Sequence, residues 1–358
     1  MKIALGLSGG IDSAMCALML LQQGHEVIGL TMTKWSPCSG IDSADKRGCY
    51  GPNEPAALAT AIESAAKLGI EHHIINLEEE FSRIVLNYYT ESYVQGRTPN
   101  PCVVCNHQIK FGALIQKARD QGILFDKFAT GHYARTRYHE PSQRWQLLAA
   151  ADPLKDQSYF LSMLTQEQLA LCLFPLGEMK KSELKEFARA QGYEYLVKKR
   201  ESQDFLQSSD SSPLFQDYLI KEGDFVDLNM KVLGRHKGLI HYTIGQRRNL
   251  GLAGFAEAQY VLALDTAQNR VIIGPERHLY HDSLFARFVN WISIPEPETA
   301  LFCSAKIRLA QDPVPCRVEK VHDGSYYVCF ESPVSAITPG QVVTFYDGDL
   351  VLGAGFIS

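Results

Sequence analysis

A glycine-rich segment near the N-terminus constrains the fold of this 358-residue chain more than any other feature. The segment GLSGGIDSAM, residues 6–15, follows an apolar run at 2–7 and leads into a helix-like run at 13–23 that ends before Gly24. A second apolar run follows at 25–31. Strand, turn, helix and strand within about thirty residues form a βαβ unit. The first part of the chain is therefore expected to be an α/β domain with a mostly parallel sheet.

The pattern continues and then changes along the chain. A helix is predicted at 54–68 and a strand at 71–76, after a polar loop at 34–55, and further helices at 105–121 and 181–191. From about residue 208, short alternating runs separated by Asp-Gly turns indicate antiparallel hairpins. We therefore predict three domains: 1–206 (α/β), 207–280 (small, central) and 281–358 (an antiparallel β-barrel).

Composition narrows the setting of the protein. The net charge of -5 gives no overall basic character, so an RNA-binding surface must be a local patch. No run approaches the ~20 apolar residues of a membrane span, and Asp12 interrupts the N-terminal apolar run too early for a signal peptide. Nine cysteines, an odd number, do not suggest a secreted disulfide framework. We expect a cytoplasmic protein with no membrane partner.

The glycine-rich turn itself predicts a phosphate site. Ser8, Gly9, Gly10 and Ser13 leave backbone N–H groups free to converge on an anion at the start of a helix. Neither the dinucleotide pattern GxGxxG nor the P-loop pattern is present. Asp12 has two candidate roles, as a helix cap with the turn or as a ligand of Mg²⁺, and the cap is favoured.

Seven segments carry a family resemblance. SGGIDS resembles the pyrophosphate loop of the N-type ATP pyrophosphatases. Six further segments resemble, in order, the signatures of the bacterial tRNA-specific 2-thiouridylases: GRTPNPCVVCNHQIKFG, ATGHYAR, LKDQSYFLS, ESQDF, YTIGQRRNLG and TPGQVVTFYDGDLVLGAGFI. Together they span nearly the whole chain, so the resemblance is specific.

The resemblance implies a Rossmann-like ATP pyrophosphatase domain, a central domain and a C-terminal barrel. It also implies an activity: adenylation of the 2-carbonyl of the wobble uridine of tRNA by ATP, followed by replacement of oxygen by sulfur. The residues implied for ATP are Gly6, Leu7, Ser8, Gly9, Gly10, Ile11, Asp12, Ser13, Met32 and Gly131. Those implied for tRNA are Asn100, Pro101, Cys102, Lys155, Asp156, Gln157, Arg308 and Leu309.

Cys105 occupies the position of the family's nucleophile, and a start of a helix at this residue is expected to lower the pKa of its thiol. The other isolated cysteines are interpreted as small buried apolar residues: Cys16, Cys172, Cys303, Cys316 and Cys329. Here the chain departs from the family pattern. Cys102 stands where an aspartate is usual, and Leu206 stands where the usual second cysteine carries the persulfide.

Three interpretations of this departure remain open. Cys102 and Cys105 can act together as a vicinal persulfide and resolving pair. They can instead bind a [4Fe-4S] cluster with a third ligand at Cys49 or Cys38, or all four cysteines can bind structural zinc.

The densest basic cluster comprises Arg235, His236, Lys237, Arg247 and Arg248, and these residues are candidates for phosphate contacts. Lys198, Lys199 and Arg200 form a second cluster. The loop at 34–55 is expected to close over a flipped uridine. The implied partners are tRNAs for Lys, Glu and Gln and a cysteine desulfurase or sulfur-relay protein. Two alternatives are an amide-forming ATP pyrophosphatase ligase and a catalytically inactive RNA-binding relative.

Overall fold

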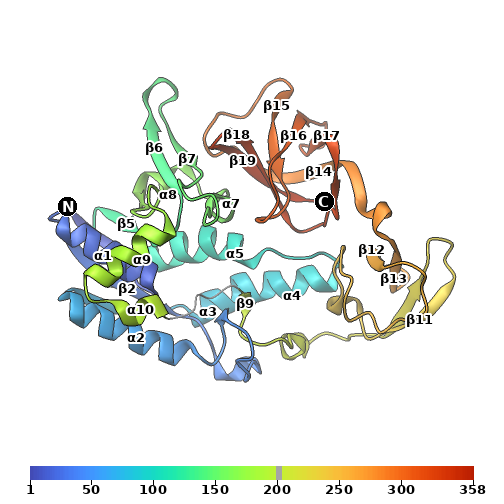
Figure 1. Cartoon of the computed structure of the whole chain (residues 1–358), viewed down its shortest axis with the longest axis horizontal. Coiled ribbons are helices and arrows are strands. Elements are labelled where there is room, and N and C mark those ends of the chain that lie inside the picture. Colours follow the sequence, from blue (N-terminus) through green and yellow to red (C-terminus); the bar gives the residue numbers. More distant parts are fainter. Residues whose placement is uncertain (199–203) are drawn as a thin grey trace.

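The structure is a computed structural model that describes residues 1–198 and 204–358 (Figure 1). Its first sheet is entirely parallel, with the strand order β4-β2-β1-β5-β8. The strands are β1 (Lys2–Gly6), β2 (Glu26–Thr33), β4 (Glu71–Asn76), β5 (Lys127–Ala129) and β8 (Cys172–Leu173). Apolar side chains on both faces of the central strands β1, β2 and β5 are buried, as expected for a parallel sheet covered by helices.

Helices cover both faces of this sheet. One face carries α1 (Ile11–Gln22), α2 (Glu54–Leu68), α9 (Lys181–Ala190) and α10 (Glu194–Lys198), and the helical segments at 78–94 and 101–120 cover the other. The predicted bounds of α2 and β4 agree with the structure, and α2 ends at Gly69, whose φ is 66°. Helix α1 begins two residues earlier than predicted, inside the glycine-rich segment at 6–15. The βαβ prediction is confirmed.

The segment that carries the cysteine pair forms one long, irregular helical rod. It runs through α5 (Pro101–Val104), the π-helix η3 (Cys105–Ala113) and α6 (Leu114–Asp120). The sequence predicted a helix that starts at Cys105, but Asn100 is the N-cap: its Oδ1 accepts a hydrogen bond from the Val103 N–H at 3.3 Å. Proline at the first helical position also favours this earlier start. Cys105 therefore lies one turn inside the rod.

A second rod precedes it, formed by α3 (Glu78–Phe81), the π-helix η2 (Ser82–Leu86) and α4 (Asn87–Val94). The remaining helical elements are short: α7 (Ser158–Leu161), α8 (Gln166–Leu171), and the 3₁₀ turns η1 (Pro37–Ser39), η4 (Glu140–Ser142), η5 (Ser212–Phe215), η6 (Leu239–His241) and η7 (Glu276–Leu279).

The polar loop at 34–55 contains a strand that the sequence did not predict. Strand β3 (Gly48–Tyr50) pairs in parallel with β9 (Asp204–Leu206), with Gly48 opposite Asp204 and Tyr50 opposite Leu206. A short strand that pairs with a segment about 150 residues later leaves no periodic signal in the local sequence. Tertiary contact thus holds this loop in one place.

The second half of the chain is antiparallel in the main, as predicted. A central four-stranded sheet has the order β11-β10-β13-β12, formed by β10 (Gly223–Val226), β11 (Val232–His236), β12 (Gln259–Asp265) and β13 (Arg270–Pro275). Six strands then form a barrel, closed by pairing of the first with the last: β14 (Tyr280–Asn290), β15 (Leu301–Lys306), β16 (Val314–Lys320), β17 (Tyr326–Ser335), β18 (Val342–Asp347) and β19 (Leu350–Ile357). The predicted fold class is confirmed.

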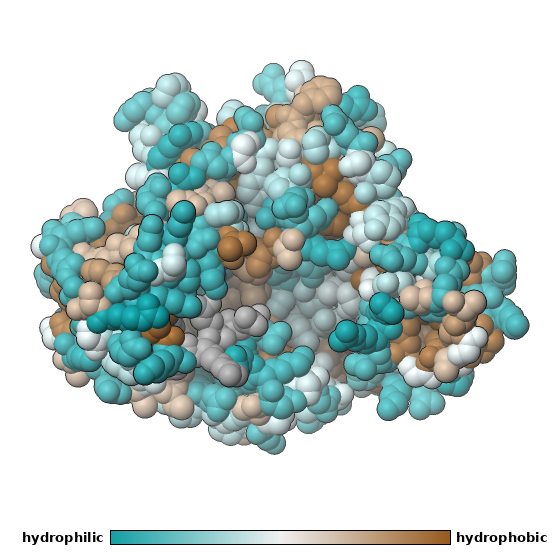
Figure 2. Space-filling model, viewed as in Figure 1, coloured by the Kyte–Doolittle hydropathy of each residue, from teal (hydrophilic) through white to brown (hydrophobic). Residues whose placement is uncertain are grey.

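The barrel is joined to the first domain by a hairpin. Strands β6 (Arg135–His139) and β7 (Arg144–Leu148) project from the first domain, and Leu147 and Leu148 of β7 pair with Val351 and Leu350 of β19 (Figure 1). Figure 2 shows the molecule from the same side as Figure 1, and this face is hollowed in its middle, below the barrel. Among the described residues, no helix is long and apolar enough to cross a bilayer.

Candidate active site

The phosphate turn, residues 6–13, has the backbone that an anion site needs. Gly9 has a φ of 71°, and a Cβ atom there would lie 2.7 Å from the Ala57 carbonyl oxygen of α2. Only glycine fits this close approach. The Ser13 hydroxyl accepts a hydrogen bond from the Ser8 N–H at 3.2 Å and donates to the Gly10 carbonyl at 3.1 Å. The turn is thus fixed before any ligand binds.

A cavity of about 360 Å³ opens at this turn, and we call it the phosphate-turn cavity. Seven of the ten residues predicted for ATP line it: Gly6, Leu7, Ser8, Asp12, Ser13, Met32 and Gly131. The other three are absent from its lining, because Gly9 packs against α2, Gly10 caps α1 and Ile11 is buried in the core. Sequence reasoning missed several further lining residues, among them Lys34, Glu54, Lys110 and His132.

Asp12 is not the helix cap that we expected. Gly10 is the N-cap of α1, with no side-chain cap bond. Asp12 Oδ1 instead accepts hydrogen bonds from Lys181 Nζ at 2.6 Å and from the Tyr133 hydroxyl at 3.0 Å. Because the Lys181 side chain is only 8% exposed, this ion pair is held largely out of water. Asp12 therefore positions a lysine beside the phosphate turn.

A second ion pair, between Lys34 and Glu54, lies in the lining of the phosphate-turn cavity. Lys34 Nζ is 2.9 Å from Glu54 Oε2, and Glu54 Oε1 accepts hydrogen bonds from the backbone N–H groups of Lys34 and Trp35. Burial lowers the pKa of Lys34, but the neighbouring Cys49 and Glu54 outweigh burial, and the pKa is raised. Lys34 thus stays charged in the lining of the phosphate-turn cavity, where it also interacts electrostatically with Cys49 and Cys105.

The Cys102 and Cys105 thiols are more protected than the sequence suggested. Cys105 is 6% exposed and lies in the main hydrophobic cluster. Burial raises the pKa of Cys105 to about 11, although Lys110 lowers it in part. Burial, with Cys49 next, raises the pKa of Cys102 to about 12. The prediction of a lowered pKa at Cys105 is therefore wrong, since desolvation outweighs the effect of the helix terminus.

This correction has a measurable consequence. Alkylation of Cys105 by iodoacetamide is expected to rise about tenfold per pH unit from about pH 7 to about pH 10, because only the thiolate reacts and its fraction grows until the pH nears the pKa. Lys110→Met is expected to move this profile to higher pH, since Lys110 lowers the pKa of Cys105. Peptide mass spectrometry measures it, with Cys38 as the exposed reference. A profile that levels off below about pH 8 contradicts the burial argument.

The barrel holds the segment just before the cysteine pair. Gln341 Nε2 donates to the carbonyls of Thr98 at 3.1 Å and Pro99 at 2.9 Å. The Thr98 N–H donates in turn to the Pro339 carbonyl at 2.8 Å. The Asn100 N–H donates to the Tyr88 hydroxyl at 3.1 Å. The TPGQ segment of the barrel is thus a positioning element for the helix that carries Cys102 and Cys105.

The cysteines do not form a metal-ligand set as they lie. Within the described part of the chain, no three His, Cys, Asp or Glu side chains come together to hold a metal ion. Cys49 and Cys38 are exposed, whereas Cys105 is buried, and Cys49 Sγ donates to the Phe205 carbonyl at 3.5 Å. The structure therefore does not converge Cys49, Cys102 and Cys105 as cluster ligands, nor the four cysteines around zinc.

The residues predicted for tRNA fall into two groups. Asn100 and Pro101 are buried, and Gln157 lines the phosphate-turn cavity, where its Oε1 accepts from the Tyr133 N–H at 3.0 Å. Asp156 accepts hydrogen bonds from Ala150 and Ser158 and so holds its own turn. Exposed or half-exposed side chains form the second group: Cys102, Lys155, Arg247, Arg248, Arg308 and Leu309.

Some members of the basic clusters have other roles. His236 is 1% exposed, and burial lowers its pKa, so it is a neutral core residue of the central sheet. Arg235 pairs with Asp224 at 2.9 Å, and Lys198 pairs with Glu194 at 3.6 Å. Lys199, Arg200 and the start of the ESQDF segment lie outside the described residues.

The other isolated cysteines are mainly core residues, as interpreted. Cys16, Cys172 and Cys316 are buried, while Cys303 and Cys329 are half-buried. Cys303 and Cys316 face each other across β15 and β16, with their sulfur atoms 3.7 Å apart.

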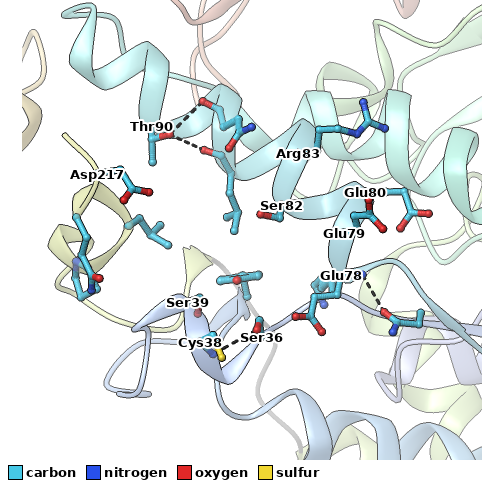
Figure 3. A pocket seen from close by; sticks show the side chains of 18 of the residues that line it. Ser36, Cys38, Ser39, Glu78, Glu79, Glu80, Ser82, Arg83, Thr90 and Asp217 are labelled. Atoms are coloured by element: carbon cyan, nitrogen blue, oxygen red, sulfur yellow. Dashed lines mark hydrogen bonds between the residues drawn. The ribbon is translucent and has the colours of Figure 1, made fainter.

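A second, larger cavity of about 850 Å³ lies beyond Lys34 (Figure 3). Its labelled lining includes Cys38 on one side and Glu78, Glu79, Glu80 and Asp217 on others, and the sequence analysis did not predict this cavity. Lys34, Arg83 and Lys117 line it as well, and Lys117 pairs with Glu80 at 2.7 Å, so the lining carries charges of both signs.

Comparison with known proteins decides the family. Residues 1–207 match the family described as "tRNA methyl transferase HUP domain", residues 214–275 its PRC-barrel domain, and residues 281–357 the "Aminomethyltransferase beta-barrel domain". The tRNA-specific 2-thiouridylase MnmA of Geotalea uraniireducens is 42% identical over 99% of this chain and 94% of that protein. That of Magnetococcus marinus is 44% identical over 99% and 98%. This chain belongs to the tRNA-specific 2-thiouridylase family.

Membership in the thiouridylase family confirms the resemblance drawn from the seven segments. Leu206, at the position of the usual second cysteine, is 7% exposed and lies in the same hydrophobic cluster as Cys105.

Proposed function

We propose that this chain catalyses the ATP-dependent 2-thiolation of the wobble uridine of tRNA, at position 34. One observation carries the proposal: Lys34 and Lys110 line the phosphate-turn cavity and also act electrostatically on Cys105. A phosphate site and a thiol that share the same two cations can adenylate a carbonyl and then displace AMP with sulfur.

The first step is adenylation. The uracil 2-oxygen attacks the α-phosphate of ATP, and pyrophosphate leaves from the phosphate turn. The backbone N–H groups of the turn bind the departing phosphates, and the Asp12–Lys181 pair places a cation beside them. Lys34 and Lys110 balance the charge of the nucleotide. Phe128, Leu114 and Met32 give this cavity an apolar part beside its charged groups.

The second step is sulfur transfer by the vicinal pair. The outer sulfur of a persulfide on Cys105 attacks C2 of the uridine, and AMP leaves with the original oxygen. The Cys102 thiolate then attacks Sγ of Cys105, which forms a Cys102–Cys105 disulfide and releases 2-thiouridine. A dithiol reductant restores the two thiols. We favour this pathway over a [4Fe-4S] cluster, since the described cysteines are not arranged as three ligands.

Mg²⁺ is proposed to travel with the nucleotide rather than to occupy a protein cage. Asp12 Oδ1 is already engaged by Lys181 and Tyr133, which leaves it poorly suited as a metal ligand. Mg²⁺ commonly takes most of its ligands from phosphate oxygens and water. No step above depends on a metal ligand from the protein.

The tRNA is proposed to lie along the hollowed face below the barrel (Figure 2). Exposed Arg247, Arg248 and Arg308 come from the central segment and the barrel, so the segments 207–280 and 281–358 would hold the RNA while 1–206 carries the chemistry. We propose tRNAs for Lys, Glu and Gln as acceptors and a cysteine desulfurase or sulfur-relay protein as donor.

Replacement of both Arg247 and Arg248 by alanine is expected to weaken tRNA binding and to flatten its salt dependence. Two fewer phosphate contacts reduce the slope of log K against log salt by about 1.5. Filter binding between low and moderate salt measures the slope. The Arg235→Ala variant is the control, because Arg235 is already paired with Asp224. An unchanged slope in the double variant removes these two residues from the interface.

Reconstitution tests the proposed function directly. The purified chain, unmodified tRNA transcript, ATP, Mg²⁺, a dithiol and a sulfur donor are expected to give 2-thiouridine at position 34, read by nucleoside mass spectrometry, with one AMP and one pyrophosphate per product. Omission of ATP is expected to stop the reaction. Formation of AMP and pyrophosphate with a carboxylate and ammonia, but never with tRNA, would instead identify an amide ligase.

A further inference from the structure

The burial of Cys105 limits how a donor protein can supply it with sulfur. Cys105 is 6% exposed, and Cys102 is only half-exposed in the first turn of α5. A persulfide on another protein must touch the thiol that it charges, because thiol exchange needs direct contact between sulfur atoms. A protein donor therefore cannot reach Cys105 in the structure as described.

Cys49 is an exposed thiol of the loop at 34–55. It lies in the middle of β3, between the buried residues Gly48 and Tyr50. Its neighbour Tyr50 belongs to the hydrophobic cluster that also contains Cys105. A thiolate at Cys49 would raise the pKa of Cys102, Cys105 and Lys34, so Cys49 interacts electrostatically with all three.

The strand that carries Cys49 is fixed rather than free. Gln207 is the main contact: its Nε2 donates to the Gly48 carbonyl at 3.2 Å, and its Oε1 accepts from the Asn53 N–H at 2.8 Å. A Cβ atom at residue 48 would lie 2.1 Å from the Leu206 carbonyl carbon, so only glycine fits beside β9. These contacts hold Cys49 opposite Phe205.

Cys49 therefore lies next to Leu206, the position at which the family pattern has its usual second cysteine. Cys49 Sγ is 3.5 Å from the carbonyl oxygen of Phe205, the residue directly before Leu206. The Leu206 side chain itself is buried among apolar residues. Cys49, on the neighbouring strand β3, thus places an exposed thiol beside Leu206.

We infer that Cys49 is the entry thiol, which accepts sulfur from a donor protein's persulfide and passes it to Cys105. The inference rests on the proposed function. In the first exchange the Cys49 thiolate attacks the outer sulfur of the donor persulfide; a new S–S bond forms on Cys49 and the donor leaves as a thiolate. In the second, the Cys105 thiolate attacks the outer sulfur on Cys49, and Cys49 leaves as a thiolate. Each exchange makes one S–S bond and breaks one, so no oxidant is needed.

Isotope tracing tests the order of the two thiols. A cysteine desulfurase charged with ³⁵S-labelled L-cysteine is mixed with the full chain, and labelled persulfides are trapped by alkylation and located by peptide mapping. Label is expected at Cys49 in the Cys105→Ser variant. Label at Cys105 is expected to fall about tenfold or more in Cys49→Ser, because the entry thiol is gone. Cys38→Ser is the matched control, since Cys38 is an exposed thiol of the same loop (Figure 3).

Inorganic sulfide separates the entry role from a structural one. HS⁻ can attack the adenylated C2 directly and release AMP, without any cysteine. Cys49→Ser is therefore expected to make 2-thiouridine from millimolar sulfide at about the wild-type rate, but not from the charged desulfurase. Equal labelling of Cys105 in Cys49→Ser and wild type overturns the inference, as does the same loss in Cys38→Ser. Failure of the wild type to thiolate tRNA from either donor sinks the proposed function, while the label at Cys49 still decides the entry thiol.

Discussion

Cys105→Ala is expected to abolish 2-thiouridine formation, with a loss of about 10³-fold or more, because Cys105 is the residue proposed to deliver sulfur to the activated carbon. ATP binding is expected to be unchanged, since Cys105 is absent from the lining of the phosphate-turn cavity. The measurements are nucleoside mass spectrometry for the product and calorimetry for ATP. The charged desulfurase must be the donor, because free sulfide bypasses the thiols.

The control for this variant is Cys172→Ala. Cys172 is 2% exposed and lies in the same hydrophobic cluster as Cys105, so both changes remove one buried sulfur from one core. Both are expected to cost about 1 kcal/mol of unfolding free energy, but only Cys105→Ala loses thiolation. Full thiolation in Cys105→Ala would falsify the assignment of the nucleophile. Ligase turnover that survives in Cys105→Ala would indicate the amide-forming class.

Gly9→Ala is expected to weaken ATP binding by about tenfold or more. The new Cβ atom would meet the Ala57 carbonyl oxygen at 2.7 Å and the Ala61 nitrogen at 3.0 Å. These are backbone atoms of α2, so the phosphate turn must shift, and the N–H groups that face the phosphates shift with it. The left-handed backbone at φ 71° adds a further cost of about 1 kcal/mol. Calorimetric titration with ATP measures the affinity.

Gly24→Ala separates backbone strain from the clash. Gly24 has a φ of 78°, and a Cβ atom there would meet nothing within 4 Å. Its variant is expected to lose about 1 kcal/mol of unfolding free energy with unchanged ATP affinity. If Gly24→Ala and Gly9→Ala bind ATP equally well, close packing of the turn on α2 does not shape the nucleotide site.

Local sequence predicted the first domain well, because its elements carry strong periodic signals. The helix at 54–68 and the strand at 71–76 agree with the structure to the residue. The barrel and the parallel sheet were also predicted. The part of the cavity lining that is proposed to bind phosphate could be predicted from a single motif, because the turn and its helix are adjacent along the chain.

The same reasoning failed where distant segments meet. It placed the start of the cysteine helix four residues too late, because the cap at Asn100 competes with the apolar periodicity. It assigned Asp12 to a cap, because Lys181, its partner, is 169 residues away. It also gave Cys105 a lowered pKa, because burial of a thiol depends on the whole core rather than on its neighbours along the chain.

The sequence by itself determined the family and the α/β and barrel architecture, since these follow from ordered motifs and local periodicity. Only the tertiary structure decided which charges face the thiols and which cysteine is exposed beside them. Strand β3 exists only because Gln207 and β9 hold it. Electrostatics and burial depend on distance in space, and the segments that carry Cys49, Cys105 and Lys181 meet only in the folded chain.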